Sequence, residues 1–290
     1  MKIAWINDLN PFRFSGGAGL TDRAHIEEGY RRGHEFQHVV AEDGDALLSS
    51  KADLFVISNS RAFGQDFFKS LMATGRPYSF LFHDHDCRFR LFFPAADKCR
   101  QCYLRDRWVP VYEKAASFIW LSPLHREAYL HVYPELADRR HAIIPSPVKP
   151  GEFFPMGKKR DGIMAVNALQ AFKGRQNFLD WGAARPHIPV HVVGEEPQDG
   201  LPPNVTCLGR IRPEEMNSLY NDHEAVLMLP ANPMPFERVA AEALLAGCQL
   251  ITNELVGATS YPWFQSREEV AKHCGEAPLR FWEHLESLIQ

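Results

Sequence analysis

Short apolar segments alternate with helical segments along this chain, and that alternation constrains the fold more than any other feature. Strands are predicted at Lys2 to Ile6, Leu54 to Ser58 and Pro77 to Phe82, and a helix at about Leu20 to Arg32. Strands that alternate with helices form parallel sheets with helices on both faces. The sequence therefore predicts an α/β protein.

The alternation is interrupted once, in a segment rich in Pro and Gly that runs from Pro145 to Arg160, and it resumes with a strand at Gly162 to Val166. A chain of 290 residues is long enough for two domains of ordinary size. We expect two α/β halves, residues 1–150 and 151–290, with a cleft between them.

Composition narrows the class of protein. The net charge of −4 argues against binding nucleic acid through bulk electrostatics. No apolar run is long enough to cross a membrane, and the N-terminus turns polar too soon for a signal peptide. We therefore expect a cytoplasmic protein whose six cysteines are reduced.

The segment from Asn232 to Thr252 reads as a loop, a helix from about Phe236 to Ala246, a Gly cap and a buried strand. Glu242 stands among alanines and leucines in that helix. A buried carboxylate is costly unless it is paired or binds a ligand. An exposed helix face is the alternative.

Three further positions are candidates for anion binding or catalysis. The loop at Gly16 and Gly17 lets backbone N–H groups approach an anion, although a plain turn explains it too. Lys173 opens a helix, where a cation opposes the helix dipole and so indicates an anion; a solvated lysine is the alternative. His83 and Asp84 follow a strand, at the edge where parallel sheets bind ligands, and the alternative is a histidine bonded to backbone.

A basic segment from 88 to 107 is predicted to be irregular, and it suits an anionic acceptor, the inner face of a membrane, or plain solvent. Cys87, Cys99 and Cys102 are candidate zinc ligands because they combine a C-x-x-C pair with a third thiol. The alternative is three separate reduced thiols.

The order of these landmarks resembles the GT-B glycosyltransferases, and among them the retaining family four. The resemblance implies two Rossmann-like α/β domains that face each other across a central cleft, with the C-terminal helices packed back on the first domain. The resemblance covers nearly the whole chain and rests on Gly16-Gly17, Gly33 to Glu35, His83-Asp84, Ile144 to Val148, Lys173-Gly174, Val193 to Glu195, Val205 to Ile211 and Pro233 to Gly257.

This resemblance implies transfer of a sugar from a nucleotide-diphosphate sugar to a glycan, a lipid-linked sugar or another hydroxyl acceptor, with no cofactor and no divalent metal required. It implies that Glu242 binds the ribose and that Arg210 and Ile211 edge the base. Lys173, with the Gly16-Gly17 loop, would stabilise the diphosphate. His83 would lie near the anomeric centre, oriented by Asp84.

The chain also departs from the family pattern. Met234 stands where the first of two signature glutamates is expected, and Glu237 stands where the family has Gly. Phe236 keeps the pattern between them. The arginine expected near Ala168 is missing, and Arg175 is a candidate replacement.

These departures leave two other functions open. The first is a nucleotide-sugar-binding protein of the same fold that has lost transfer. The second is another GT-B-like enzyme, such as an epimerase or a phosphorylase, although no lysine context for pyridoxal phosphate is evident. Fold alone does not decide among them.

Overall fold

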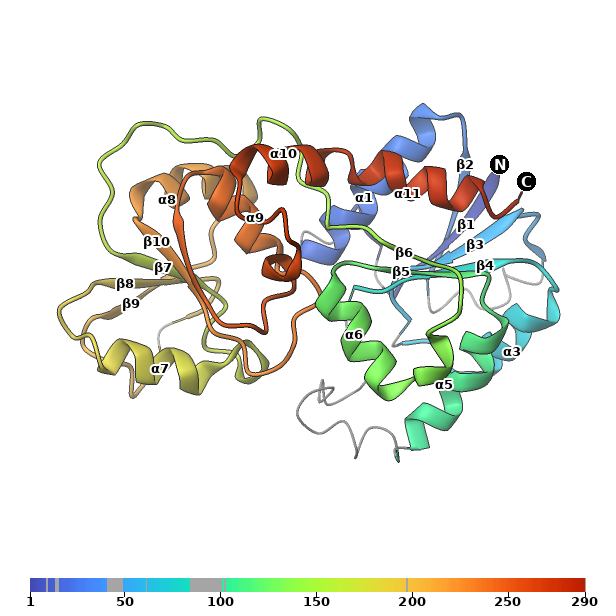
Figure 1. Ribbon diagram of the computed structural model, residues 1–290, viewed down its shortest axis with the longest axis horizontal. Helices are drawn as coiled ribbons and strands as arrows, with labels where there is room; N and C mark the ends of the chain where they lie inside the picture. The colour runs from blue at the N-terminus through green and yellow to red at the C-terminus, as the bar shows by residue number, and fades with distance from the viewer. Residues whose placement is uncertain are drawn as a thin grey trace. The chain divides into compact units, whose positions relative to one another are not determined.

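The computed structural model describes residues 1–8, 10–13, 16–40, 49–60, 62–83, 101, 103–196 and 198–289. The chain divides into two compact units. Unit 1 comprises Met1–Pro147 with Glu276–Gln290, and unit 2 comprises Val148–Gly275. Each unit is built on its own parallel sheet (Figure 1).

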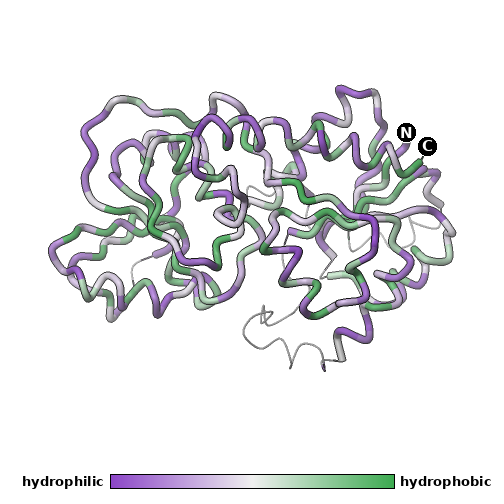
Figure 2. Tube along the Cα trace, in the orientation of Figure 1, coloured by the Kyte–Doolittle hydropathy of each residue, from purple (hydrophilic) through white to green (hydrophobic). Residues whose placement is uncertain are grey.

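Unit 1 contains a six-stranded sheet in the order β2-β1-β3-β4-β5-β6, in which every neighbouring pair is parallel. Its central strands are continuous apolar runs because helices cover both faces; the hydrophobic colour concentrates on them (Figure 2). The strands are β1 Lys2–Ile6, β2 Glu35–Val39, β3 Leu54–Ile57, β4 Tyr78–Leu81, β5 Ser117–Trp120 and β6 His141–Ile143.

The helices of unit 1 divide between the two faces of this sheet. α1 and α11 lie on one face, and α3, α5 and α6 lie on the other (Figure 1). Their bounds are α1 Gly17–Arg31, α3 Gln65–Ala73, α5 Tyr103–Lys114, α6 Pro123–Val132 and α11 Ala277–Glu286, with the short 3-10 helix η2 at Pro134–Leu136.

The last helix of the chain holds α1 in place. The indole N–H of Trp282 donates to the backbone carbonyl of His25 at 2.7 Å, and Glu286 pairs with Arg32 at 2.7 Å. Gly29 permits this approach, because a Cβ there would lie 2.5 Å from the Trp282 ring. Helix α11 thus fixes the helix that carries the polar cluster described below.

The prediction that the basic segment from 88 to 107 is irregular is wrong at its C-terminal end, since residues 103–107 belong to α5. This helix continues through Pro110, which interrupts helical patterns in a sequence. Trp108, Val111 and Tyr112 are buried in the core of unit 1. Burial of these side chains outweighs the local cost of the proline.

Unit 2 contains a five-stranded parallel sheet in the order β11-β10-β7-β8-β9, with α7 on one face and α8 and α9 on the other (Figure 1). The strands are β7 Ile163–Val166, β8 Val190–Val193, β9 Val205–Gly209, β10 Ala225–Met228 and β11 Gln249–Thr252. The helices are α7 Arg175–Ala183, α8 Met216–Asp222, α9 Arg238–Leu245 and α10 Arg267–Gly275, with the 3-10 helices η3 Ala171–Lys173, η4 Pro213–Glu215 and η5 Gly257–Ser260.

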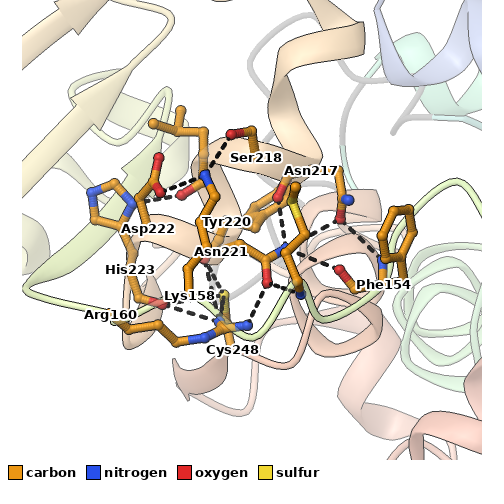
Figure 3. Close-up of polar contacts among 12 residues, drawn as sticks. Phe154, Lys158, Arg160, Asn217, Ser218, Tyr220, Asn221, Asp222, His223 and Cys248 are labelled. Atoms are coloured by element: carbon orange, nitrogen blue, oxygen red, sulfur yellow. Dashed lines mark hydrogen bonds and ion pairs between the residues drawn. The ribbon is translucent and has the colours of Figure 1, made fainter.

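The segment from 154 to 160 is fastened along α8 within unit 2 (Figure 3). The backbone N–H groups of Phe154 and Met156 donate to the side chains of Asn217 and Asn221 at 3.0 and 2.7 Å. The guanidinium of Arg160 donates to three backbone carbonyls. This part of the Pro- and Gly-rich segment is therefore fixed within one unit, and the division between the units precedes it.

Candidate functional site

A buried carboxylate lies where three strands of the unit 1 sheet end. Asp22, on α1, is fully buried and accepts hydrogen bonds from Ser58 Oγ at 2.8 Å and from Asn7 Nδ2. Its Oδ1 atom lies 2.6 Å from Nε2 of His83. Asn7, Ser58 and His83 follow β1, β3 and β4. Open parallel sheets bind ligands at this edge, so the cluster is a candidate site.

His83 is thus paired with Asp22, while the predicted partner Asp84 lies outside the described residues. When the Nε2–H of a histidine faces a carboxylate, Nδ1 is left as an acceptor. No hydrogen bond to Nδ1 of His83 is seen within the part of the chain that the structure describes. Sequence reasoning missed Asp22 because 61 positions separate it from His83; an acid inside the glycine-rich start of α1 was the available signal.

Two neighbouring histidines are poor bases. Burial, followed by the charge of His83, holds the pKa of His25 well below its ordinary value. The His25 ring stacks on Phe281 with 4.0 Å between ring centroids. Burial also lowers the pKa of His38, although the charge of Asp22 opposes this. Both rings therefore stay neutral near pH 7, and neither competes with His83 for the carboxylate.

The predicted glycine loop begins α1. Gly16 is the N-cap of this helix and, as a glycine, has no side chain with which to cap it. Gly17 is exposed, and a Cβ on it would meet nothing within 4 Å. A glycine N-cap leaves the first N–H groups of α1 without a bond from the cap side chain, which agrees with the predicted role without testing it.

In unit 2, a tight turn holds Lys173 beyond the carboxyl end of β7. The 3-10 helix η3 ends at Lys173, its C-cap Gly174 has a φ of 85°, and α7 begins at the next residue. A Cβ on Gly174 would lie 1.9 Å from the carbonyl oxygen of Leu229. Only glycine fits both the dihedral angle and the close approach, so the turn fixes where Lys173 emerges.

The ammonium group of Lys173 forms an ion pair with the carboxylate of Glu237, the N-cap residue of α9. Glu237 has a φ of 68°, in the left-handed region that glycine normally occupies. The two side chains belong to the lining of one small pocket. That lining consists of Val166, Ala168, Lys173, Phe178, Leu227, Met228, Leu229, Pro230 and Glu237.

Glu242 is buried in α9 and its carboxylate is already bonded. Tyr220 Oη donates to one oxygen at 2.9 Å, and Arg238 Nε donates to the other at 2.6 Å. Burial raises the pKa of Glu242, and these two partners lower it in part. Each carboxylate oxygen can accept a second hydrogen bond, so the predicted ribose role stays a prediction.

The remaining predicted residues are spread over unit 2. Arg175 is the first residue of α7, and its Nε atom has no hydrogen-bond partner among the described residues. Arg210 is exposed and Ile211 half-buried in the loop after β9. Met234 lies in the loop before α9, where its backbone pairs with a neighbouring segment. The ring of Phe236 is 2% exposed, which makes it a core residue.

Among the described residues, no three His, Cys, Asp or Glu side chains are grouped so that they could hold a metal ion. The candidate zinc ligands Cys87, Cys99 and Cys102 lie outside the described residues. In the described part of the chain, no helix is both long enough and apolar enough to cross a bilayer.

No family model matches this sequence, and no curated protein matches it significantly. Solved structures do match. Sucrose-phosphate synthase from Thermosynechococcus elongatus superposes with a TM-score of 0.70 at 15% identity, covering 100% of this chain and 95% of that chain. HepE from Anabaena, in complex with UDP and glucose, superposes with a TM-score of 0.65 at 14% identity, covering 100% of this chain and 97% of that chain.

The chain has the GT-B fold. The two parallel sheets with covering helices are the Rossmann-like domains of that fold, as the sequence predicts. A third match is an α-glucosyltransferase in complex with UDP, with a TM-score of 0.60 at 11% identity over 100% of this chain and 99% of that chain. At such identities the likeness establishes the GT-B fold, and the chemistry must be argued from the residues of this chain.

Proposed function

We propose that this protein is a glycosyltransferase that takes its sugar from a nucleotide-diphosphate donor. The observation that carries the proposal is Lys173, fixed by Gly174 at the carboxyl edge of the unit 2 sheet of a GT-B fold. Two proteins that the chain resembles, HepE and an α-glucosyltransferase, have been solved with UDP or UDP-glucose bound. A donor of that class suits a cation at this edge.

The leaving group is a nucleoside diphosphate, so negative charge develops on it as the glycosidic bond breaks. Lys173, Arg175 and the N-terminus of α7 supply positive charge and N–H donors to this charge. Glu242 accepts from the ribose hydroxyls beside its bonds to Tyr220 and Arg238. The backbone at Arg210 and Ile211 edges the base.

Within unit 1, the Gly16-Gly17 loop and His83 are the groups to which the resemblance gives a part in the reaction. We assign to His83 the hydrogen bond to a hydroxyl at the reacting centre, because Asp22 holds its Nε2 and leaves Nδ1 as an acceptor. The resemblance of the Pro233 to Gly257 segment to the family signature supports retention of anomeric configuration. It also supports a glycan, lipid-linked or other hydroxyl acceptor.

Binding by a panel of donors tests the proposal. Thermal shift and calorimetry with UDP-glucose, GDP-mannose, ADP-glucose and a CMP-sugar should show binding of one diphosphate donor and weak or no binding of the monophosphate CMP-sugar. Lys173→Gln should weaken that binding about 10- to 100-fold through loss of a charged hydrogen bond. Lys159→Gln, at an exposed lysine of the same unit, is the matched control.

Slow hydrolysis of the bound donor separates an enzyme from a binding protein. The second candidate function is a binding protein that has lost transfer, and Met234 in place of an acid favours it. Binding without hydrolysis or transfer under any acceptor would support that candidate. If no nucleotide sugar binds, both functions are wrong.

A further inference from the structure

One glutamate of unit 2 keeps an unfavourable backbone conformation. Glu237 and Asn167 are the non-glycine residues with positive φ in the described part of the chain. Asparagine tolerates the left-handed region, because its short side chain bonds locally, whereas glutamate gains no such compensation. Residues in this state concentrate at ligand sites, where the side chain repays the strain.

The side chain of Glu237 is held in a pocket by an ion pair. Its carboxylate pairs with Lys173, and the two side chains are only 10% and 19% exposed. Both line the small pocket at the carboxyl edge of the unit 2 sheet. A ligand in this pocket must offer a negative group to Lys173 without repelling Glu237. A phosphate that bonds Lys173 meets only the first requirement, because it brings its negative charge close to Glu237.

A ligand satisfies both groups only if it carries hydrogen-bond donors next to its phosphate. A free nucleoside diphosphate has no donor beyond its terminal phosphate, so Glu237 repels it. A nucleotide sugar carries the hydroxyls of its sugar there, and a carboxylate accepts hydrogen bonds from them. A sugar that bears its own carboxylate meets repulsion again.

We propose that Glu237 is a specificity residue that selects an intact donor with a neutral or amino sugar over the free nucleoside diphosphate and over donors of acidic sugars. This inference rests on the proposed function, because it requires the diphosphate to bind at Lys173. It assigns to Glu237 a contact with the sugar that Met234, an apolar residue, does not make by hydrogen bonding. It also gives the protein a means of releasing the diphosphate product.

The test compares dissociation constants within matched pairs of ligands. Calorimetry is run with UDP-glucose and UDP, with GDP-mannose and GDP, and with ADP-glucose and ADP. The proteins are the unaltered chain, Glu237→Gln and Glu237→Gly. Glu237→Gln removes only the charge, while Glu237→Gly also relieves the left-handed backbone. Glu224→Gln, at an exposed glutamate of the same unit, controls for net charge.

For the pair that binds, Glu237→Gln should tighten binding of the free diphosphate and weaken binding of the sugar nucleotide. The preference for the sugar nucleotide should fall about tenfold, the worth of one charge-assisted hydrogen bond. If UDP-glucose and UDP are the pair that binds, UDP-glucuronic acid is measured as well. It should bind the unaltered protein more weakly than UDP-glucose does, and its affinity should rise in Glu237→Gln. Glu237→Gly should match Glu237→Gln in these ratios.

Nucleotide binding with an unchanged preference in both variants overturns this inference and leaves the proposed function standing. A preference lost only in Glu237→Gly also overturns it, since the charge of Glu237 would then not be responsible. If no member of any pair binds the unaltered protein, the inference and the proposed function are both wrong.

Discussion

The bonded carboxylate of Glu242 allows its contribution to stability to be worked out before any ligand is known. Two donors point at it, Tyr220 Oη at 2.9 Å and Arg238 Nε at 2.6 Å, and Glu242 is 8% exposed. Glu242→Gln keeps the shape but turns an amide N–H₂ group toward one donor. Arg238 would retain its ion pair with Glu152, at 3.7 Å.

Hydrogen bonds to a buried charged group are worth about 1.5–3 kcal/mol each, and breaking a buried pair costs about 3–5 kcal/mol. Because Glu152 partly compensates Arg238, Glu242→Gln should lower the free energy of unfolding by about 2–3 kcal/mol. Tyr220→Phe removes one donor and should cost about 1 kcal/mol. In the double variant the two losses should not add, since they share one bond.

Urea denaturation followed by tryptophan fluorescence measures these free energies, with Glu224→Gln as the control at an exposed position. If Glu242→Gln stays within about 0.5 kcal/mol of the unaltered protein, the buried network is not as the structure places it. Nucleotide affinity is then compared in Glu242→Gln, which stays folded, so that loss of the ribose contact is separated from loss of the fold.

The pH dependence of Glu242 follows from the same burial. Its pKa is raised in the folded protein, so the folded state holds the proton more tightly than the unfolded chain does. The contribution of Glu242 to the free energy of unfolding is therefore greatest at acid pH. It falls as pH rises from the ordinary glutamate pKa through the raised pKa of the folded state. Glu242→Gln should abolish that component of the slope.

Three further predictions concern other positions. Gly174→Ala should lower the free energy of unfolding by about 3 kcal/mol or more, because its Cβ would collide with the Leu229 carbonyl; near-native stability in urea would refute the turn geometry. Burial lowers the pKa of His284 to about 4, so folding stability should fall as pH drops from 6.5 toward 4, and His284→Gln should flatten that fall in thermal melts. Asp22→Asn should weaken the preference of His83 for a proton on Nε2, measured by ¹⁵N shifts of the ring; an unchanged tautomer would refute the pairing.

The sequence was sufficient for the fold because strand and helix periodicity are local. The apolar runs at Lys2 to Ile6 and Gln249 to Thr252 are strands of the two sheets, and the alternation of strands with helices predicts the α/β class that the structure shows. The GT-B fold itself was predicted from the resemblance of the motifs to that family. The start of α5 was missed, since it depends on burial of Trp108 and Tyr112 against distant strands. No local pattern contains that contact.

The candidate site was less predictable because its bonds join distant residues. The pairing of His83 with Asp22 spans 61 positions, and that of Lys173 with Glu237 spans 64. Residue type and place relative to a strand identified His83 and Lys173, since those are local properties. Their partners depend on how the strands are ordered in each sheet.

Glu237 shows how a local rule misleads when an element begins later than expected. A helix from Phe236 would put Glu237 in its first turn, about 300° of helical rotation from the position of Met234, and the sequence leaves open whether Glu237 substitutes for the missing acid. The structure begins α9 at Arg238, so Glu237 is the N-cap residue and lies outside the helical repeat. Its left-handed backbone directs its side chain toward Lys173, with which it forms an ion pair. The three-residue offset from Met234 therefore says nothing against a role for Glu237 beside the diphosphate.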